Sequence, residues 1–334
     1  MSTQKIPQFS ILELAPIRFN QTIQHTLAHS VELAQFAEKI GYHRFWLAEH
    51  HNMDGIASSA TAVLLTHLLN HTSTLRLGSG GIMLPNHAPL VVAEQFGTMA
   101  TLFPNRVDLG LGRAPGTDPA TMHALRRGRQ ETEDQFPQDV LEILSYFDKP
   151  QNHQKIIATP GQHTHVPVWL LGSSLFSAQL AAKLGLPYAF ASHFAPRMLH
   201  QALQLYRENF QPSQYLDQPY VAIGIPTVVA DSDAEAEFLA TSVYQRILAL
   251  FRGESLKLRP PIASMENLWS TAEQNAVMNF LAMAQIGSTS KVKAGLQSVI
   301  HQTNADEIFF TCDLYDTEKR LRNFELLMQI RNDL

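Results

Sequence analysis

The stretch VPVWLLGSSLFSAQLAAKLG (residues 166–185) holds a strand and a helix in immediate succession. Residues 166–172 form a short apolar run that ends in glycine, which is typical of a buried strand. Two serines follow, and the apolar spacing beyond them predicts a helix that stops at Gly185. A new apolar run begins at Pro187, so the chain returns at once to a strand. This order of strand, helix and strand is the building unit of a parallel sheet.

The same alternation extends along the whole chain. Each short apolar run is followed by a longer stretch with the 3.6-residue spacing of a helix. The runs occupy residues 9–14, 44–48, 75–79, 107–112, 166–172, 187–192, 220–230 and 306–312. Strict alternation favours parallel strands joined by right-handed crossovers. Eight such units fit a closed (β/α)₈ TIM barrel of the α/β class better than an open doubly wound sheet.

The chain length suits one domain. Residues 1–334 have the length of a single barrel, so we expect one TIM-barrel domain rather than two domains. Residues from about 252 to 283 include Pro260-Pro261 and lack a regular pattern, which predicts an irregular insertion before the last strand–helix unit. The helix after the seventh strand opens with Ser232 and Glu235, a spacing that predicts a capping box.

Composition and charge exclude several classes of partner. The formal net charge of −5 gives no reason to expect nucleic acid or an anionic membrane surface. The chain has no run of about 18 apolar residues, which a membrane span needs, and MSTQKIPQFS at its start lacks the apolar core of a secretory signal. The single cysteine, Cys312, cannot form an intrachain disulfide, which fits a reducing compartment. We therefore expect a cytoplasmic protein.

Polar residues gather where the predicted strands end. In a barrel of this class the chemistry lies at the C-terminal ends of the strands and in the loops that follow them. The second strand ends in Glu49, His50 and His51, directly after the apolar FWLA. Glycine, serine, histidine and one arginine follow the other strands, and they include Gly80, Gly81, Arg113, Gly172, Ser173, Ser174, Ser177, His193 and Asp313.

The junction at residues 172–177 has two interpretations. Serine at the start of a helix is commonly only an N-cap. The free N–H groups of a helix N-terminus also bind phosphate, and Ser177 lies one turn further on. Arg113 lies in a loop rich in glycine and proline, where contact with an anion is favoured over a purely solvated role. From the residues alone, a structural cap and a phosphate site both remain open.

Other patterns were weighed against simpler interpretations. Gly110, Gly112 and Gly116 resemble a dinucleotide fingerprint, but the third glycine comes one residue late, and Pro115 and Pro119 oppose a helix there. A metal-dependent barrel hydrolase would use as ligands His50, His51, His193 and Asp313. No His-x-His ends the first strand, so we expect no metal site. An apolar stripe fits either core or a subunit interface; it comprises Val63, Leu64, Leu68, Val91, Val92 and Phe96.

Four stretches together resemble the bacterial luciferase-like, flavin-dependent monooxygenases. They are FWLAEHHNMDGIASSATAVL (45–64), LRLGSGGIMLPNHAPLVVAEQFGTM (75–99), RVDLGLGRAPGTDP (106–119) and VWLLGSSLFSAQLAAKLGLPYAFA (168–191). The likeness continues through the last strand to RLRNFELL (320–327), so it covers nearly the whole chain. It is nearer to uncharacterised oxidoreductases of that family than to the light-emitting luciferase.

The resemblance implies a barrel that holds FMN non-covalently at its C-terminal rim, usually in a dimer. By motif, Glu49 would lie beside the flavin and His50 would be the catalytic proton-transfer residue, a role suited by an unperturbed histidine pKa near 6.5. Gly80 and Gly81 would border the isoalloxazine ring. The flavin phosphate would be held by Arg113, Gly172, Ser173, Ser174 and Ser177. One departure is Gly112, which stands where luciferase has a reactive cysteine and weighs against light emission but not against flavin binding.

The resemblance therefore predicts an FMN-dependent monooxygenase that uses reduced flavin and O₂ on a small organic substrate. All eight strand–helix units are used by one barrel, which leaves no room for a nicotinamide domain. We expect a two-component system, in which a separate flavin reductase supplies reduced FMN, and a homodimer. The alternatives are a catalytically inert flavin-binding protein of the same fold and the metal-dependent hydrolase, and coenzyme F420 is a less favoured cofactor.

Overall fold

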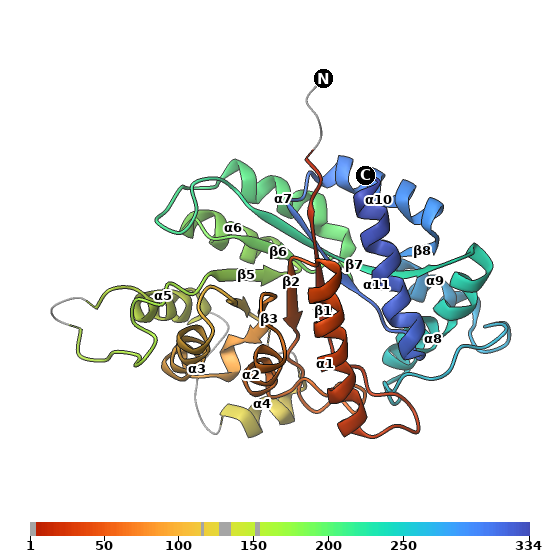
Figure 1. Ribbon diagram of the computed structural model, residues 1–334, viewed down its shortest axis with the longest axis horizontal. Helices are drawn as coiled ribbons and strands as arrows, with labels where there is room; N and C mark the ends of the chain where they lie inside the picture. The colour runs from red at the N-terminus through yellow and green to blue at the C-terminus, as the bar shows by residue number, and fades with distance from the viewer. Residues whose placement is uncertain (1–4, 115–116, 127–134, 151–153) are drawn as a thin grey trace.

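The computed structural model describes residues 5–114, 117–126, 135–150 and 154–334, and it shows a closed barrel of eight parallel strands (Figure 1). The barrel strands are β1 (Gln8–Glu13), β2 (Arg44–Leu47), β3 (Arg76–Met83), β4 (Val107–Gly112), β5 (Val168–Gly172), β6 (Tyr188–Phe190), β7 (Val221–Ala230) and β9 (Glu307–Thr311). Strands β1 to β6 pair in sequence order, and β9 lies between β1 and β7. Pairing of Tyr188 with Val221 joins β6 to β7 and closes the barrel. The predicted (β/α)₈ fold is confirmed.

Helices surround the barrel. They are α1 (Ile23–Ile40), α2 (Thr61–His71), α3 (Pro89–Leu102), α4 (Pro119–Arg126), α5 (Phe136–Phe147), α6 (Leu175–Leu184), α7 (Leu199–Glu208), α8 (Asp233–Arg252), α9 (Thr271–Phe280), α10 (Thr289–Thr303) and α11 (Thr317–Asn332), with short 3₁₀ turns at Leu84–Asn86 and Pro196–Met198. The prediction that Pro119 opposes a helix is wrong. Pro119 is the first residue of α4, a position where a backbone N–H would have no hydrogen-bond partner within the helix. Within the described ranges, no helix combines the length and the apolar character that crossing a membrane requires.

The insertion is more regular than the sequence suggested. Residues 271–280 form α9, because Ser270 and Glu273 exchange the two hydrogen bonds of a capping box. A ninth strand, β8 (Gln285–Ser288), was not predicted, and it pairs with β7 beyond the part of β7 that closes the barrel. The capping box predicted at the start of α8 forms only in part. The Ser232 hydroxyl accepts the Glu235 N–H at 3.2 Å, but the Glu235 carboxylate accepts from the Lys319 ammonium at 2.6 Å.

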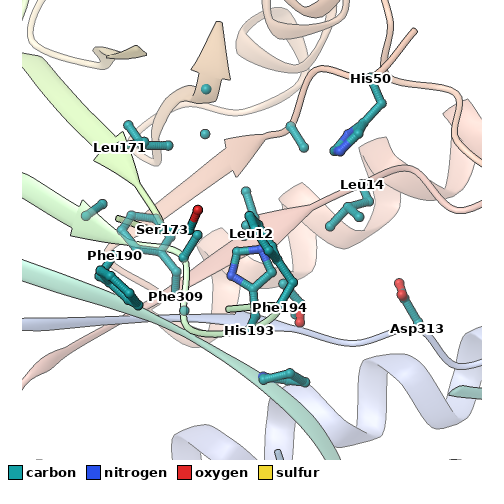
Figure 2. A pocket seen from close by; sticks show the side chains of 18 of the residues that line it. Leu12, Leu14, His50, Leu171, Ser173, Phe190, His193, Phe194, Phe309 and Asp313 are labelled. Atoms are coloured by element: carbon teal, nitrogen blue, oxygen red, sulfur yellow. The ribbon is translucent and has the colours of Figure 1, made fainter. Parts of the chain in front are cut away.

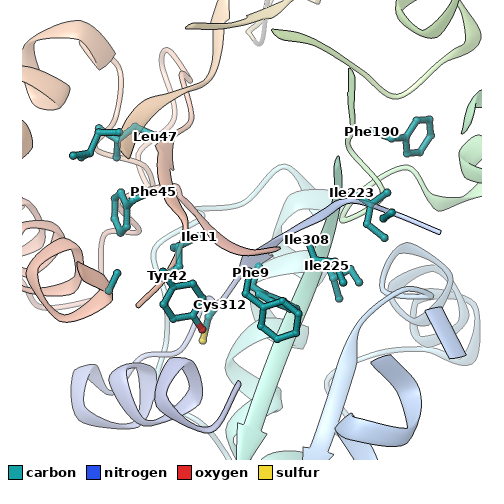
Figure 3. Packing of buried hydrophobic residues seen from close by; sticks show 14 of the residues in the cluster. Phe9, Ile11, Tyr42, Phe45, Leu47, Phe190, Ile223, Ile225, Ile308 and Cys312 are labelled. Atoms are coloured by element: carbon teal, nitrogen blue, oxygen red, sulfur yellow. The ribbon is translucent and has the colours of Figure 1, made fainter. Parts of the chain in front are cut away.

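The main hydrophobic core lies between the barrel and its helices. Figure 3 shows Phe9 of β1 close to Ile308 of β9 and Ile225 of β7, with Ile11 and Phe45 further along the same layer. Alternate residues of each strand point outward into this layer, as expected for strands with both faces buried. The apolar stripe predicted as core or interface divides. Its members Leu64, Leu68, Val92 and Phe96 are buried in this core, whereas Val63 and Val91 are 71% and 45% exposed.

The N-terminal end of the barrel interior is filled by an ionic group. Arg44, the first residue of β2, donates hydrogen bonds inside the barrel to Asp108 of β4 at 2.7 Å and to Glu307 of β9 at 3.2 Å. Burial acts to raise the pKa of Asp108, but the charges of Arg44 and Arg76 hold that pKa below its usual value. The barrel is therefore closed at this end by charges that satisfy one another.

An aromatic layer lies directly above the ionic group. Trp46 stacks on Phe309 with ring centroids 4.2 Å apart, and it meets Trp169 edge-on at 5.1 Å. The Arg44 guanidinium lies 5.1 Å from the Trp169 ring, so the two layers are in contact. Together these side chains leave open space inside the barrel only toward the C-terminal ends of the strands.

A buried ion pair fixes the C-terminal end of β1. Glu13 forms a hydrogen-bonded ion pair with Arg320 of α11, and both side chains are 1% exposed. Arg320 also donates to the Cys312 carbonyl at 2.7 Å, just after β9, and the Ser30 hydroxyl donates to Glu13 at 3.1 Å. Burial acts to raise the pKa of Glu13, but Arg320 overcomes it and holds the pKa below its usual value. The pair joins two adjacent strands at the rim.

We predict that Arg320→Ala costs about 3–5 kcal/mol of unfolding free energy, because it leaves Glu13 buried without a counter-charge. Arg322→Ala on the same helix is the matched control. Its partners Asp231 and Glu325 lie at the surface, so its loss should cost about 0–1 kcal/mol. Urea denaturation measures both. Because the folded-state pKa of Glu13 is lowered, the wild-type advantage should be present above the ordinary carboxyl pKa and shrink as the pH falls below it. Equal losses of unfolding free energy in the two variants would contradict a stabilising role for the buried Glu13–Arg320 ion pair.

Candidate active site

A cavity of about 530 Å³ lies above the aromatic layer, at the C-terminal ends of the barrel strands (Figure 2). Its volume falls within the range of about 300–1,000 Å³ that is common for small-molecule sites. Leu12, Trp46 and Phe309 line it from below, and Val243 and Ile247 of α8 line it from the side. A largely apolar wall of this kind excludes water from whatever binds there.

The structure brings most of the predicted rim residues together around this cavity. Those that line it are His50, Gly80, Gly81, Arg113, Gly172, Ser173, Ser174, Ser177, His193 and Asp313. They come from the ends of six different strands, as the barrel rule requires. Glu49 and His51 are not among the lining residues. The catalytic and cofactor-binding roles given to these side chains stay predictions.

Glycines form one wall of the cavity. Gly80 and Gly81, joined by a cis peptide bond, lie in β3 where its register with β4 shifts. A Cβ on Gly81 would lie 2.7 Å from the Gly110 carbonyl oxygen, and one on Gly80 would lie 2.7 Å from Leu12 Cδ1. Gly112 lines the same wall, beside Met83. The backbone is thus exposed to the cavity without side chains, a surface against which a flat ring can lie.

A polar pocket lies at the β5 end of the cavity. Ser174 is the N-cap of α6, yet its hydroxyl makes no capping hydrogen bond. A Cβ on Gly172 would lie 2.7 Å from the Ser177 hydroxyl oxygen, so the glycine lets that side chain fold under the loop. Arg113 crosses from β4 and lies 4.3 Å from the ring of Phe176 on α6. The helix N-terminus, the serines and the guanidinium make this end suited to an anion.

Phe176 was missed by the sequence analysis, although it lies between two of the predicted serines. Its ring holds the Arg113 guanidinium by a cation–π contact and is 36% exposed. A signal was present, since Phe176 lies in the first turn of the predicted helix, directly beside the polar serines. The contact orients Arg113 across the mouth of the pocket.

Glu49 lies behind the cavity wall and holds two histidines. The Nε2 atoms of His51 and His87 each lie 2.8 Å from its Oε1, and its Oε2 accepts the Met83 N–H at 3.4 Å. Burial acts to raise the pKa of Glu49, but the two imidazole hydrogen bonds hold that pKa below its usual value. His87 was missed by the sequence analysis, though it ends the segment after β3. The group links the loops that follow β2 and β3.

The ligand set of the metal alternative is not assembled. Among the described residues, the one group of histidine and carboxylate atoms close enough to share an ion is Glu49, His51 and His87, within 4.8 Å of one another. The predicted ligands His50, His193 and Asp313 are not part of it. The 2.8 Å separations in this group are hydrogen-bond lengths that satisfy the carboxylate and both imidazoles.

The two histidines of the cavity are neutral at pH 7, which corrects the expectation that His50 titrates near 6.5. Burial, followed by the charge of Arg246, lowers the pKa of His50 to about 4. Burial, followed by the charge of His50, lowers the pKa of His193 to about 4. The Nδ1 atoms of both rings are buried and have no hydrogen-bond partner in the protein. Each ring can therefore offer one group to a bound molecule.

Arg246 of α8 is a cavity residue that the sequence analysis did not single out. It is 7% exposed, and its Nη1 lies 2.8 Å from Oδ2 of Asp313. In the sequence it follows a helical pattern, where a lone arginine is usually solvated. Its position on the inward face of α8 places a second guanidinium in the cavity.

Comparison with known proteins gives a consistent result. Residues 8–307 match the family model described as luciferase-like monooxygenase. A protein of Escherichia coli (strain K12) described as a luciferase-like monooxygenase is 54% identical over 99% of both chains. The N-acetyl-S-alkylcysteine monooxygenase of Bacillus subtilis (strain 168) is 44% identical over 55% of this chain and 56% of its own length.

Solved structures share the fold. That of apo-MsnO8 superposes with a TM-score of 0.92 at 32% identity and covers 98% of each chain. The oxygenating constituent of 3,6-diketocamphane monooxygenase from Pseudomonas putida, in complex with FMN, has a TM-score of 0.74 at 13% identity, over 97% of this chain and 98% of that one. An F420-dependent secondary alcohol dehydrogenase has a TM-score of 0.68 at 14% identity, over 98% of this chain and 99% of that one.

The last two likenesses, at low identity, bear on the fold alone. The assignment of the chain to a family rests on the match to residues 8–307 and on the identity of 54% to a relative over nearly the full length of both chains. The predicted resemblance is thereby confirmed. The chain belongs to the luciferase-like monooxygenase family and is an enzyme of its flavin-dependent monooxygenase class.

Proposed function

We propose that this enzyme takes reduced FMN from a separate flavin reductase and uses it with O₂ to oxygenate a small organic substrate in the barrel cavity. The observation that carries the proposal is the pairing of an anion pocket with a glycine wall in one cavity. Arg113, Ser173, Ser174 and Ser177 are placed to receive a phosphate, and the wall beside Gly81 is placed to receive a flat ring. FMN has these two parts, a terminal phosphate and an isoalloxazine ring.

The chain supplies binding, orientation and a dry site. Bound reduced FMN would supply the electrons that activate O₂. The apolar side chains of β1, β2 and β9 would exclude water from the ring, and the α6 N-terminus would orient the phosphate. Neutral His50 accepts or donates one hydrogen bond at Nδ1 and is the candidate for moving a proton between substrate and solvent. Glu49 acts on the cavity through the backbone of Met83, which lines it.

FMN is favoured over coenzyme F420, which one structural neighbour uses. A structural neighbour with the same fold was solved in complex with FMN, which supports this choice. The name of the Bacillus relative points to an N-acetyl-S-alkylcysteine, a thioether that carries a carboxylate, as one class of substrate to test.

We also propose a homodimer in a reducing cytoplasm. A candidate contact face between the two subunits is formed by exposed Val63 of α2 and exposed Val91 and Leu102 of α3. Sedimentation equilibrium measures the oligomeric state.

We predict that Arg113→Ala weakens FMN binding about ten- to a hundredfold, because a charge-assisted hydrogen bond to phosphate contributes about 1.5–3 kcal/mol. Riboflavin, which lacks the phosphate, is the matched control and should bind the variant and the wild type alike. Wild-type protein should also bind FAD less well than FMN. Flavin fluorescence titration measures all of these affinities. A loss of the same size for FMN and riboflavin would show that Arg113 does not meet the phosphate.

His50→Ala should retain the fold and FMN but slow oxygenation by about 10²–10⁴-fold, the usual contribution of a general acid or base. His51→Ala is the control; it breaks a hydrogen bond to Glu49 and should lower stability more than turnover. Because the pKa of His50 is about 4, its neutral form persists as the pH falls, so kcat/KM should lose the His50 contribution only near pH 4. An acidic limb near pH 6.5 that disappears in His50→Ala would contradict this assignment.

The two-component proposal is tested by the source of electrons. The enzyme mixed with FMN, O₂ and NADPH alone should consume NADPH very slowly, because the residues that the structure describes form one barrel and include no separate dinucleotide-binding fold. Addition of a flavin reductase and a substrate should start oxygenation, followed by product mass with labelled O₂. Fast, saturable NADPH consumption without the reductase would overturn the two-component scheme. Flavin binding with no substrate-dependent oxygen consumption would instead favour an inert flavin-binding protein.

A further inference from the structure

The cavity has a second cationic end, on the far side of the barrel mouth from Arg113. Arg113 follows β4, whereas Asp313, which holds Arg246, follows β9. Strands β4 and β9 are four steps apart in either direction around the eight-stranded barrel, so they lie on opposite sides. Arg113 and Arg246 are the two cationic side chains among the described residues that line the cavity. The FMN phosphate can occupy only one of them.

The Arg246 guanidinium keeps unused donor capacity. It is 7% exposed, and its Nη1 makes a 2.8 Å ionic contact with Asp313 but no hydrogen bond of acceptable geometry. Its Nη2 makes one long hydrogen bond, 3.4 Å, to the Gly55 carbonyl. A guanidinium carries five N–H donors, and these two contacts leave several of them without an acceptor. An oxygen acceptor that enters the cavity can therefore receive hydrogen bonds from this guanidinium.

Two imidazoles line the same cavity as Arg246. They belong to His50 and His193, and neither ring makes a hydrogen bond within the described protein that would compete with a ligand. His193 is held in place by packing: a Cβ on Gly224 would lie 2.2 Å from its Nδ1, and Phe194 meets its ring edge-on at 4.7 Å. Figure 2 shows His50, His193 and Asp313 around the open space.

We propose that Arg246 anchors a carboxylate of the substrate, with His50 and His193 completing its hydrogen bonds, so that the enzyme acts on apolar organic acids. The inference rests on the proposed function for the reaction itself, but the anion site stands on its own geometry. A carboxylate matches the fork of a guanidinium better than any neutral acceptor. The walls around Arg246 are apolar, from Val243, Ile247 and Leu250 of its own helix, and they fit the rest of such a molecule.

Asp313 is the positioning residue of this site. It is the acidic side chain among the described cavity residues, and it fixes the guanidinium while keeping the free protein neutral there. An unpaired guanidinium in an apolar cavity would be strongly destabilising. The same carboxylate lowers the attraction of Arg246 for a second anion. Removing Arg246 and neutralising Asp313 therefore change carboxylate binding in opposite directions, whereas damage to the fold changes both in one direction.

The test uses octanoate and its neutral analogue octanamide as probes, titrated by calorimetry into the full-length enzyme saturated with FMN. Wild-type enzyme should bind octanoate more tightly than octanamide. Arg246→Met should weaken octanoate about ten- to a hundredfold and change octanamide little. Asp313→Asn should strengthen octanoate and change octanamide little. Arg252→Met, at the exposed end of the same helix and paired with Glu273, is the matched control and should leave both affinities as they are.

Several outcomes overturn the proposal. They are equal affinities of octanoate and octanamide for the wild type, no binding of octanoate, and equal losses of both probes in Arg246→Met. Where Arg246→Met does not fold, Asp313→Asn decides alone, and unchanged or weaker octanoate binding refutes the site. Titrations repeated without FMN separate this inference from the proposed function. Octanoate binding that depends on Arg246 in a protein that binds no flavin would keep the anion site and remove the monooxygenase scheme.

Discussion

The ionic group at the N-terminal end of the barrel is the constraint on which the site depends. Arg44 can lie inside a closed barrel only because the fully buried carboxylates of Asp108 and Glu307 meet it there. The aromatic layer of Trp46 and Phe309 then seals the charges from above. With that end filled, the described part of the barrel keeps its open room at the C-terminal ends of the strands, where most of the polar residues that follow the strands line one cavity.

The charges of that cavity are separated in space. Arg113 lies at the β4 side and Arg246 at the β9 side, and the middle is occupied by two imidazoles that burial keeps neutral. A protonated His50 would lose its hydration and be repelled by Arg246, and the attraction of buried Glu49 does not outweigh these two effects. The low pKa of His50 therefore follows from the same packing that makes the cavity dry. A neutral imidazole in such a place can take up a proton only as a bound molecule supplies negative charge beside it.

The sequence indicated the barrel because alternation of strand and helix is a local pattern that leaves few topologies. It also indicated much of the cavity lining, from His50 to Asp313, since residues that follow parallel strands must meet at one end. It did not indicate Arg246, which lies in a regular helix where the inward face is set by packing against β7 and β8. The sequence did not indicate the role of His87 or the lowering of the His50 pKa to about 4. Both depend on hydrogen-bond partners and burial that come from segments distant in the chain. Strand β8 was missed because its four residues carry little apolar pattern and form only beside β7.

The glycines at the strand ends do not all have the same cause. A Cβ on Gly110 would lie 2.2 Å from the Ser79 carbonyl oxygen, and one on Gly78 would lie 2.6 Å from that of Asp108, so backbone alone dictates both residues. At Gly112 the nearest atom to such a Cβ is Sδ of Met83, at 2.9 Å, the far end of a flexible side chain. The barrel would accept a small side chain there if the methionine shifted. Packing alone therefore does not require glycine at position 112, the one motif position where the resemblance to luciferase places a cysteine.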